Sequence, residues 1–272
     1  MSRLIIADSV TLLGANARQA VAIAGSHGGV YAAYCAAKAG VRAVILNDAG
    51  IGRDRAGVSG LDYLQALNIP AATVSNRSAR IGSGGDAQHR GIVSVTNAAA
   101  AALGVMPGMS AAEAAALLER APAGSGLIPE QRESRIDLLP RDSNGPAVAL
   151  LDSATLMSPQ DKGQIVVTAS HGGLIGDRPE TAAKVDVFAA VFNDADIGIN
   201  GAGITRLPAL ERRGIAAATV SAWSARIGDG RSIYEDGTIS HVNETARRYG
   251  GEVGIRTREF IDRLRQAGKE RP

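Results

Sequence analysis

Residues 21–40 read VAIAGSHGGVYAAYCAAKAG, and this stretch decides the fold. The run before Ser26 is continuously apolar, which is typical of a strand that is covered on both faces. The alanine-rich run after the two glycines predicts a helix, and Gly40 stands where such helices end. A buried strand that leads directly into a helix indicates a unit of a parallel α/β sheet.

The same strand and turn recur later in the chain. IVVTASHGG at 165–173 repeats the SHGG motif 144 positions on, and beyond the next helix the offset becomes 146. Such self-similarity is best sought before any single motif is interpreted. The matched pairs are DSVTL (8–12) with DSATL (152–156), NDAGIGRDRAGVS (47–59) with NDADIGINGAGIT (193–205), and AATVSNRSARIG (71–82) with AATVSAWSARIG (217–228).

Each copy has the predicted order β-α-β-α-β, and crossovers of this kind build a parallel sheet with helices on its faces. We therefore predict an α/β fold in which one β-α-β-α-β module occurs twice. The sheets should be mainly parallel and flanked by helices, and the two copies should have a pseudo-twofold arrangement. The predicted units are a first repeat at 1–104, a connecting helix and hairpin at 105–151, and a second repeat with a C-terminal helix at 152–272.

Three local signals refine this outline. Residues 110–121 predict a helix that begins at a Ser110 cap, with a glutamate three positions later. A hairpin is expected to turn on Asn144 and Gly145. Pro179 is expected to shorten or displace the first helix of the second copy, because proline disrupts helix interiors.

Composition limits the classes of function. The chain has 272 residues, 45% of them hydrophobic, and a formal net charge of +2. Basic residues are spread out, which argues against a nucleic-acid partner. No apolar run is long enough to cross a bilayer, and the start lacks the form of a secretory signal, so we expect no membrane partner and a cytoplasmic location. Cys35 is the single cysteine, which excludes an intrachain disulfide and a cage of several cysteines.

The three repeated motifs each follow a predicted strand, so all should lie at the carboxyl edge of the sheet, where ligands bind in α/β folds. In SHGG, histidine offers a general acid or base, serine a nucleophile, and the two glycines expose backbone N–H groups for an anion or oxyanion. The alternative is a tight turn with a locally hydrogen-bonded histidine. The candidates are catalytic His27, His171, Ser26 and Ser170, and substrate-binding Gly28, Gly29, Gly172 and Gly173.

The other two motifs offer polar partners for such a site. The aspartates of NDA are candidates to orient a histidine, and its asparagines to bind a carbonyl, although an Asx turn uses the same side chains. In SARIG, arginine is a candidate clamp for a carboxylate, with a structural ion pair to Asp48 or Asp194 as the alternative. The candidates are catalytic Asp48 and Asp194, and substrate-binding Asn47, Asn193, Ser78, Arg80, Ser224 and Arg226.

Familiar cofactor motifs are absent from the sequence. It contains no GxxxxGK[ST] loop, and GSHGG differs from the G-x-S-x-G elbow. We predict no cofactor. A divalent metal held by His27 or His171 with Asp48 or Asp194 stays open as an alternative, although no spacing is specific for zinc.

A strand that ends in His-Gly, then a helix, then a strand that ends in Asp-Ala resembles the layout of caspase-type peptidases. In that family a cysteine follows the Asp-Ala. Here the corresponding positions hold Gly50 and Asp196, so the resemblance implies a similar order of strands without the family's nucleophile.

We therefore expect a small-molecule enzyme, most simply a hydrolase acting on a carboxylate- or amide-bearing metabolite. An isomerase or lyase would use nearly the same residues, and a non-catalytic ligand-binding or assembly protein with a caspase-like layout is the alternative from another class. A small-molecule substrate is the expected partner, and a homo-oligomer is compatible with the sequence.

Overall fold

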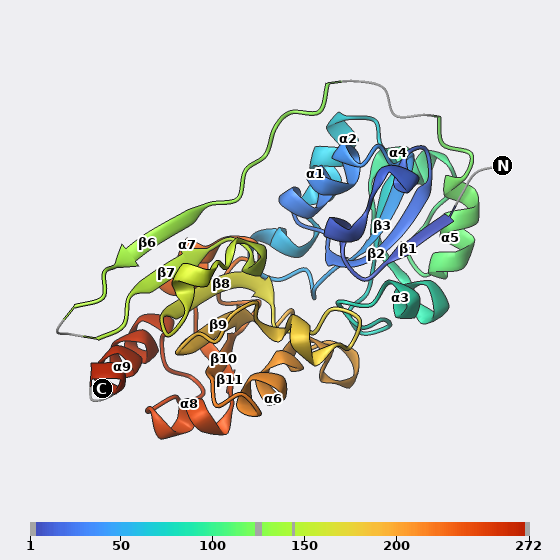
Figure 1. The fold of residues 1–272 in the computed structure, drawn as a ribbon. Helices are drawn as coiled ribbons and strands as arrows, with labels where there is room; N and C mark the ends of the chain where they lie inside the picture. Colours follow the sequence, from blue (N-terminus) through green and yellow to red (C-terminus); the bar gives the residue numbers. More distant parts are fainter. Residues whose placement is uncertain (1–3, 123–126, 143–144, 270–272) are drawn as a thin grey trace.

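The computed structural model describes residues 4–122, 127–142 and 145–269. In these residues the chain forms two mixed, mostly parallel sheets of five and six strands, flanked by helices (Figure 1). This confirms the predicted α/β class with mainly parallel sheets.

The first sheet has its strands in chain order. Strands β1 to β4 run parallel, and β5 is antiparallel to β4. The antiparallel last strand was not predicted from the sequence. The strands are β1 (Leu4–Ala7), β2 (Val21–His27), β3 (Ala43–Asn47), β4 (Ala71–Val74) and β5 (Val93–Thr96).

Helices cover both faces of this sheet. Because side chains alternate along a strand, Ala22 and Ala24 of β2 pack with one set of helices, and Val21 and Ile23 with the other. The first set is α1 (Val30–Lys38) and α2 (Gly60–Ala66). The second set is α3 (Gly84–Arg90), α4 (Ala98–Ala102) and α5 (Ala111–Leu118).

The second sheet repeats the parallel order and adds a strand at one edge. Strands β7 to β10 are parallel, while β6 and β11 pair antiparallel at the two edges. The strands are β6 (Arg135–Leu139), β7 (Val148–Leu151), β8 (Ile165–His171), β9 (Ala189–Asn193), β10 (Ala216–Val220) and β11 (Ile239–Val242).

The helices of the second sheet differ from those of the first at one place. We call residues 4–104 the first half and residues 152–269 the second half. Where α1 follows SHGG in the first half, the second half has a 3-10 turn at Pro179–Ala182, as the proline predicted. Helix α6 packs on the same face as this turn, and the other three helices pack on the opposite face. They are α6 (Arg206–Glu211), α7 (Gly230–Asp236), α8 (Glu244–Arg248) and α9 (Thr257–Lys269).

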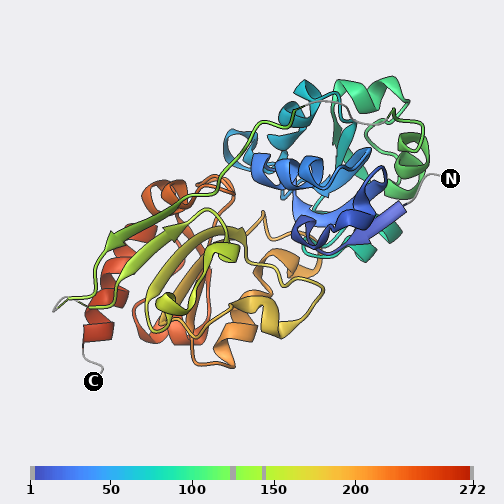
Figure 2. The ribbon, with the colours of Figure 1, turned by 45° about the horizontal axis from the view of Figure 1, so that its top comes forward.

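The predicted connecting segment 105–151 is divided between the two sheets. Helix α5, which begins at the expected capping box of Ser110 and Glu113, packs on the first sheet. Strands β6 and β7 form the expected antiparallel pair within the second sheet. The predicted turn residue Asn144 lies outside the described residues. The described residues 127–134, which lead into β6, run along the outside of the molecule (Figure 2).

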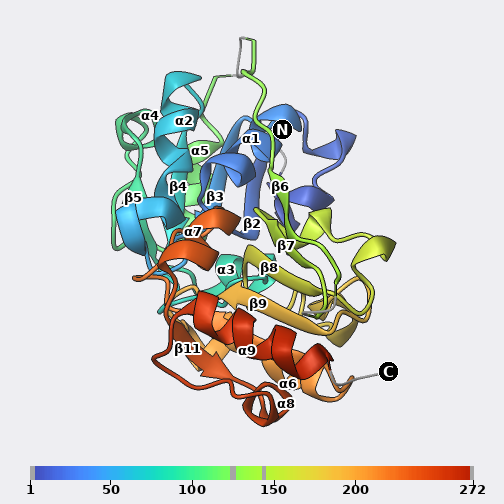
Figure 3. The same cartoon turned by 90° about the vertical axis from the view of Figure 1, so that its left-hand side faces the viewer.

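The loops at the carboxyl ends of the two sets of strands meet. Arg53 N–H donates to Ala222 O, and Ile199 N–H donates to Asn76 O, both at 2.8 Å. Figure 3 shows the two sheets stacked one above the other, with the loops between them. A small apolar cluster from both halves fills this contact; its members are Ala49, Ala56, Ile81, Ala195, Ala202 and Ile227.

In the part of the chain that the structure describes, the helices are too short or too polar to cross a membrane.

Candidate functional site

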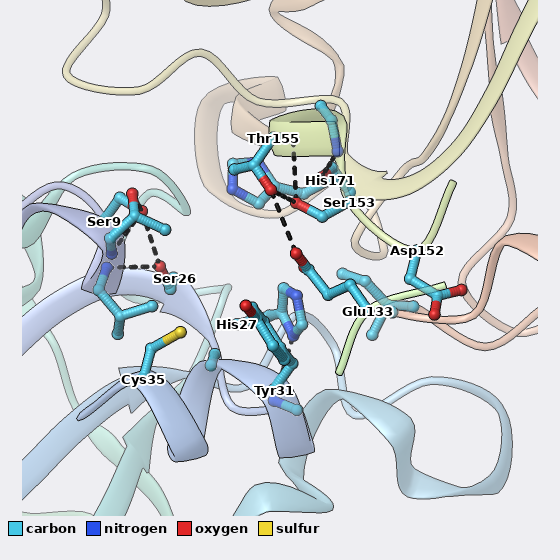
Figure 4. Close-up of a pocket in the computed structure, with 18 of the residues that line it drawn as sticks. Ser9, Ser26, His27, Tyr31, Cys35, Glu133, Asp152, Ser153, Thr155 and His171 are labelled. Carbon is cyan, nitrogen blue, oxygen red and sulfur yellow. Dashed lines mark hydrogen bonds between the residues drawn. The ribbon is translucent and has the colours of Figure 1, made fainter. Parts of the chain in front are cut away.

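A cavity of about 590 Å³ lies between the two sheets. Its walls come from both halves and from the segment that joins them, and both SHGG histidines line it. Figure 4 shows side chains of the two halves on opposite sides of the cavity, with Glu133 between them. His27 and His171, each the last residue of a strand, therefore share one candidate site.

Each histidine ring is held by a backbone N–H two residues further on. Gly29 N–H donates to His27 Nδ1 at 3.1 Å, and Gly173 N–H donates to His171 Nδ1 at 3.2 Å. Because Nδ1 accepts, the proton of the neutral ring is on Nε2. Both rings therefore offer an N–H donor at Nε2 rather than a basic nitrogen.

Both imidazoles are kept neutral. Burial lowers the pKa of His27 to about 4. Burial also lowers the pKa of His171 well below its usual value, and the positive charge of Arg206 and the nearby His27 ring lower it further. At neutral pH the two rings are therefore uncharged hydrogen-bond donors.

Each ring also lies against a glycine of the other half. A Cβ at Gly228 would lie 3.7 Å from His27 Cε1, and a Cβ at Gly82 would lie 3.5 Å from His171 Cε1. The SARIG loop of each half thus forms part of the wall beside the histidine of its partner half.

The two serines of SHGG hold the chain after the first strand of each half. Ser26 Oγ accepts from Val10 N–H at 3.0 Å, and Ser170 Oγ accepts from Ala154 N–H at 2.9 Å. Both serines line the cavity. Among the described residues neither hydroxyl is hydrogen-bonded to a histidine, so the base that a serine nucleophile needs is not at hand.

The glycine N–H groups that were expected to bind an oxyanion are already used. Gly28 N–H donates to Asn47 O, and Gly172 N–H to Asn193 O, while the second glycine of each motif donates to its histidine. The oxyanion role therefore has no free donor at these four positions. Close packing explains the first glycines instead, because a Cβ at Gly172 would lie 2.5 Å from a backbone oxygen.

The asparagines of the NDA motifs form the Asx turns that were expected as the alternative. Asn47 Oδ1 accepts from Ala49 N–H at 2.9 Å, while its amide donates to Ala79 O at 3.1 Å. Asn193 makes the corresponding bonds to Ala195 and Ala225.

The aspartates of the NDA motifs brace neighbouring loops. Asp48 Oδ1 accepts from the N–H groups of Gly50 and Asn76, both at 2.9 Å. Asp194 Oδ1 accepts from those of Asp196 and Ala222. Burial raises the pKa of both carboxyls. The bonds to Oδ1 thus come from loop backbone, further bonds come from the side chains of Ser94 and Ser240, and neither aspartate is bonded to a histidine.

The serines of SARIG support the backbone of their loops. Ser78 donates to Ser75 O at 2.8 Å, and Ser224 donates to Ser221 O at 2.9 Å.

The arginines of SARIG pair with carboxylates other than those expected. Arg80 pairs with Asp177 of the other half. Arg226 pairs with Asp229 at 2.8 Å and with Asp54 of the other half at 3.1 Å. The expected ion pairs to Asp48 and Asp194 are not formed, and both arginines help to join the halves.

The structure thus brings six predicted residues to the cavity wall: Ser26, His27, Gly29, Ser170, His171 and Arg226. The other candidates lie outside that wall: Gly28, Asn47, Asp48, Ser78, Arg80, Gly172, Gly173, Asn193, Asp194 and Ser224.

Glu133, from the segment between the halves, was missed. It lines the cavity, and its carboxylate accepts from Thr155 Oγ1 at 3.2 Å. Burial raises the pKa of Glu133. Its position in an irregular charged stretch, without a counterpart in the repeat, gave no sequence signal.

Arg206 was also missed. It is 4% exposed and lines the cavity. A signal did exist, because at the offset of 146 this arginine stands opposite Gly60, one position beyond the matched NDA segments.

Tyr31 and Cys35, one helical turn apart on α1, also line the cavity. Burial raises the pKa of the Cys35 thiol, which keeps it protonated and weakly nucleophilic.

A divalent metal was the open alternative. Within the described ranges, no cluster of three or more histidine, cysteine or acidic side chains is placed to hold an ion.

Compared with known proteins, the chain matches no protein-family model, no curated protein and no solved structure. The likeness to caspase-type peptidases therefore rests on the short sequence motifs alone.

Proposed function

We propose that the protein is an enzyme that carries out acid–base chemistry on a small carboxylate- or amide-bearing metabolite in this cavity, with hydrolysis as its reaction. The observation that carries the proposal is the convergence of two neutral imidazole N–H donors and one carboxyl of raised pKa on a single cavity. Perturbed titratable groups of this kind cluster at active sites.

The histidines polarise the substrate. Nε2–H of His27 or His171 donates to the carbonyl oxygen, where negative charge develops as a nucleophile adds. Because the rings are neutral and their Nδ1 atoms are anchored, they need little reorganisation during the reaction. This proposal differs from the role of general acid or base that the sequence suggested for them.

Glu133 moves the proton. Its carboxylate accepts a proton from water as the oxygen of that water adds to the carbonyl carbon. It then gives the proton to the leaving nitrogen as the C–N bond breaks, which yields an acid and an amine. The raised pKa brings the carboxyl closer to the pH at which it can both accept and donate.

We also propose that the halves arose by duplication and are related by a pseudo-twofold axis. Arg53 contacts Ala222, and Ile199 contacts Asn76; at the repeat offset of 146, Ile199 matches Arg53 and Ala222 matches Asn76. The contacts of His27 with Gly228 and of His171 with Gly82 are reciprocal as well, with offsets of 144 for the histidines and 146 for the glycines. Such reciprocity is expected when two copies pack as a homodimer would.

The test is turnover of a panel of small carboxylates and amides, followed by mass spectrometry in water enriched in ¹⁸O. Hydrolysis places one ¹⁸O atom in the new carboxyl group. Glu133→Gln should lower kcat about 100-fold or more. Glu130→Gln is the matched control, because Glu130 forms an exposed ion pair with Arg132 and lies outside the cavity wall.

His27→Asn and His171→Asn test the two imidazole N–H donors. Asparagine can accept the same N–H, as Asn47 does, but its amide reaches less far into the cavity. Full activity of Glu133→Gln would overturn the role of that carboxyl. Deuterium exchange at carbon without ¹⁸O uptake would indicate an isomerase or lyase, and binding without any turnover would indicate a non-catalytic ligand-binding protein.

A further inference from the structure

Arg206 is a buried cation with one unused donor group. Its Nε donates to Gly173 O at 3.0 Å, and its Nη1 donates to Thr181 O and Ala182 O, both at 2.7 Å. The guanidinium carbon lies 5.1 Å from the centre of the Phe192 ring. Within the described residues, Nη2 makes no hydrogen bond and no carboxylate forms an ion pair with this side chain.

Such an arrangement is costly unless an anion completes it. Removing a cation from water is strongly unfavourable, and carbonyl oxygens and an aromatic face offset this penalty only in part. Since Arg206 lines the cavity beside His171, the missing negative charge can come from a ligand bound there.

The first half has no equivalent cation. At the matched position Gly60 N–H donates to Gly28 O, as Arg206 N–H donates to Gly172 O, both at 2.8 Å. A Cβ at Gly60 would lie 2.6 Å from Ala33 Cβ and from Gly29 O, so no side chain fits there.

The two walls of the cavity differ in charge accordingly. Among the described residues, the first-half wall contains no lysine or arginine, and its one charged side chain, Asp54, pairs with Arg226. The second-half wall carries two aspartates, Asp152 and Asp229, and four cations: Arg178, Lys184, Arg206 and Arg226. The second-half wall is therefore the more positive of the two.

We propose that the cavity takes its substrate in one orientation, with a carboxylate bound by Arg206 Nη2 beside His171 and an uncharged end beside His27. This rests on the proposed function and makes Arg206 its specificity-determining residue. A carboxylate suits the site because an arginine amino group and a neighbouring imidazole N–H can each donate to one of its oxygens.

The test compares the binding of butyrate, butyramide and inorganic phosphate by NMR titration. The wild type should bind butyrate about tenfold or more tightly than butyramide, which has the same size and no charge. Tighter binding of phosphate than of butyrate would overturn the assignment of a carboxylate.

Two variants localise the effect. Arg206→Met should abolish the preference for butyrate, and Arg206→Lys, which keeps the charge but not the planar fork, should reduce it. Arg212→Met is the matched control, because Arg212 is an exposed cation at the end of the same helix and outside the cavity wall. An unchanged preference in folded Arg206→Met would overturn the proposal.

If both variants fail to fold, the orientation can be tested with crystals of the wild type soaked in 4-bromobutyrate. The anomalous signal of bromine should lie on the His27 side, with the carboxylate at Arg206, and the reverse orientation would overturn the proposal. Neither measurement depends on turnover. A wild type that turns over its substrate but shows no preference for butyrate would refute the orientation alone. A wild type that shows the preference but no turnover would refute the proposed function alone.

Discussion

His27 and His171 end strands in two different sheets, yet their rings line one cavity, and the proximity of the first ring helps to lower the pKa of the second. The Nδ1 atom of each ring accepts a hydrogen bond from the N–H of the glycine two positions further on. The properties of this pair can be tested separately from the identity of the substrate.

Gly29→Ala should displace the His27 ring. The backbone at Gly29 (φ −75°, ψ 168°) suits alanine, but the new Cβ would lie 2.7 Å from His27 Nδ1. We expect turnover to fall and the free energy of unfolding to fall by about 1–2 kcal/mol. Gly85→Ala is the control, because nothing lies within 4 Å of its Cβ position in α3. Equal behaviour of the two variants would contradict the proposed anchoring of the ring.

Acid should destabilise the protein through His27. Its folded pKa of about 4 lies below the ordinary histidine value of 6.5, so the unfolded chain binds the proton more readily between these values. Stability from this group is therefore complete above about pH 6.5 and is lost as the pH falls towards 4. Urea unfolding at pH 7 and pH 4 should show a loss that is roughly 3 kcal/mol larger in wild type than in His27→Asn. Parallel pH profiles would mean that the ring is not kept neutral by burial.

Asn47→Ala should lower stability more than it lowers ligand affinity. The change leaves Ala49 N–H and Ala79 O without their observed partner in a buried place, which costs about 2–4 kcal/mol. Asn16→Ala, at an exposed position, should change stability by less than about 0.5 kcal/mol. Loss of substrate binding with unchanged unfolding would instead support the binding role that the sequence suggested for Asn47.

Gly82→Ala should loosen the contact between the halves. Gly82 has φ +82°, and its Cβ would lie 2.2 Å from Leu174 O of the other half. Gly108 has φ +92° with nothing within 4 Å, so Gly108→Ala reports the backbone strain alone. In urea unfolding we expect Gly82→Ala to be less stable than Gly108→Ala by about 2 kcal/mol or more. A similar loss for both would show that the halves do not approach so closely.

Much of the fold was predictable because its signals are local. The apolar runs of β2 and β8, the alanine-rich helix α1 and the Ser110 capping box each act within a few residues. The short antiparallel strands β5 and β11 were missed, since four residues at a sheet edge carry little periodicity. Their place depends on pairing with β4 and β10.

The candidate site was predictable only in part. The repeat drew attention to both histidines, and the structure brings them to one wall. Asn47 and Asp48 were equally prominent in the sequence but make hydrogen bonds to loop backbone. Which polar side chain faces a cavity depends on what packs over it, and in this protein that covering comes from the other half.

The sequence by itself determined the α/β class, the strands that end in SHGG and the gathering of three loops at a sheet edge, because periodicity and turn chemistry act along the chain. Only the tertiary structure decided that the two edges face one another, that Glu133 enters the cavity between them, and that Arg206 is left with an unpaired charge. These depend on burial and on contacts between residues far apart in the chain, and such contacts leave no local pattern.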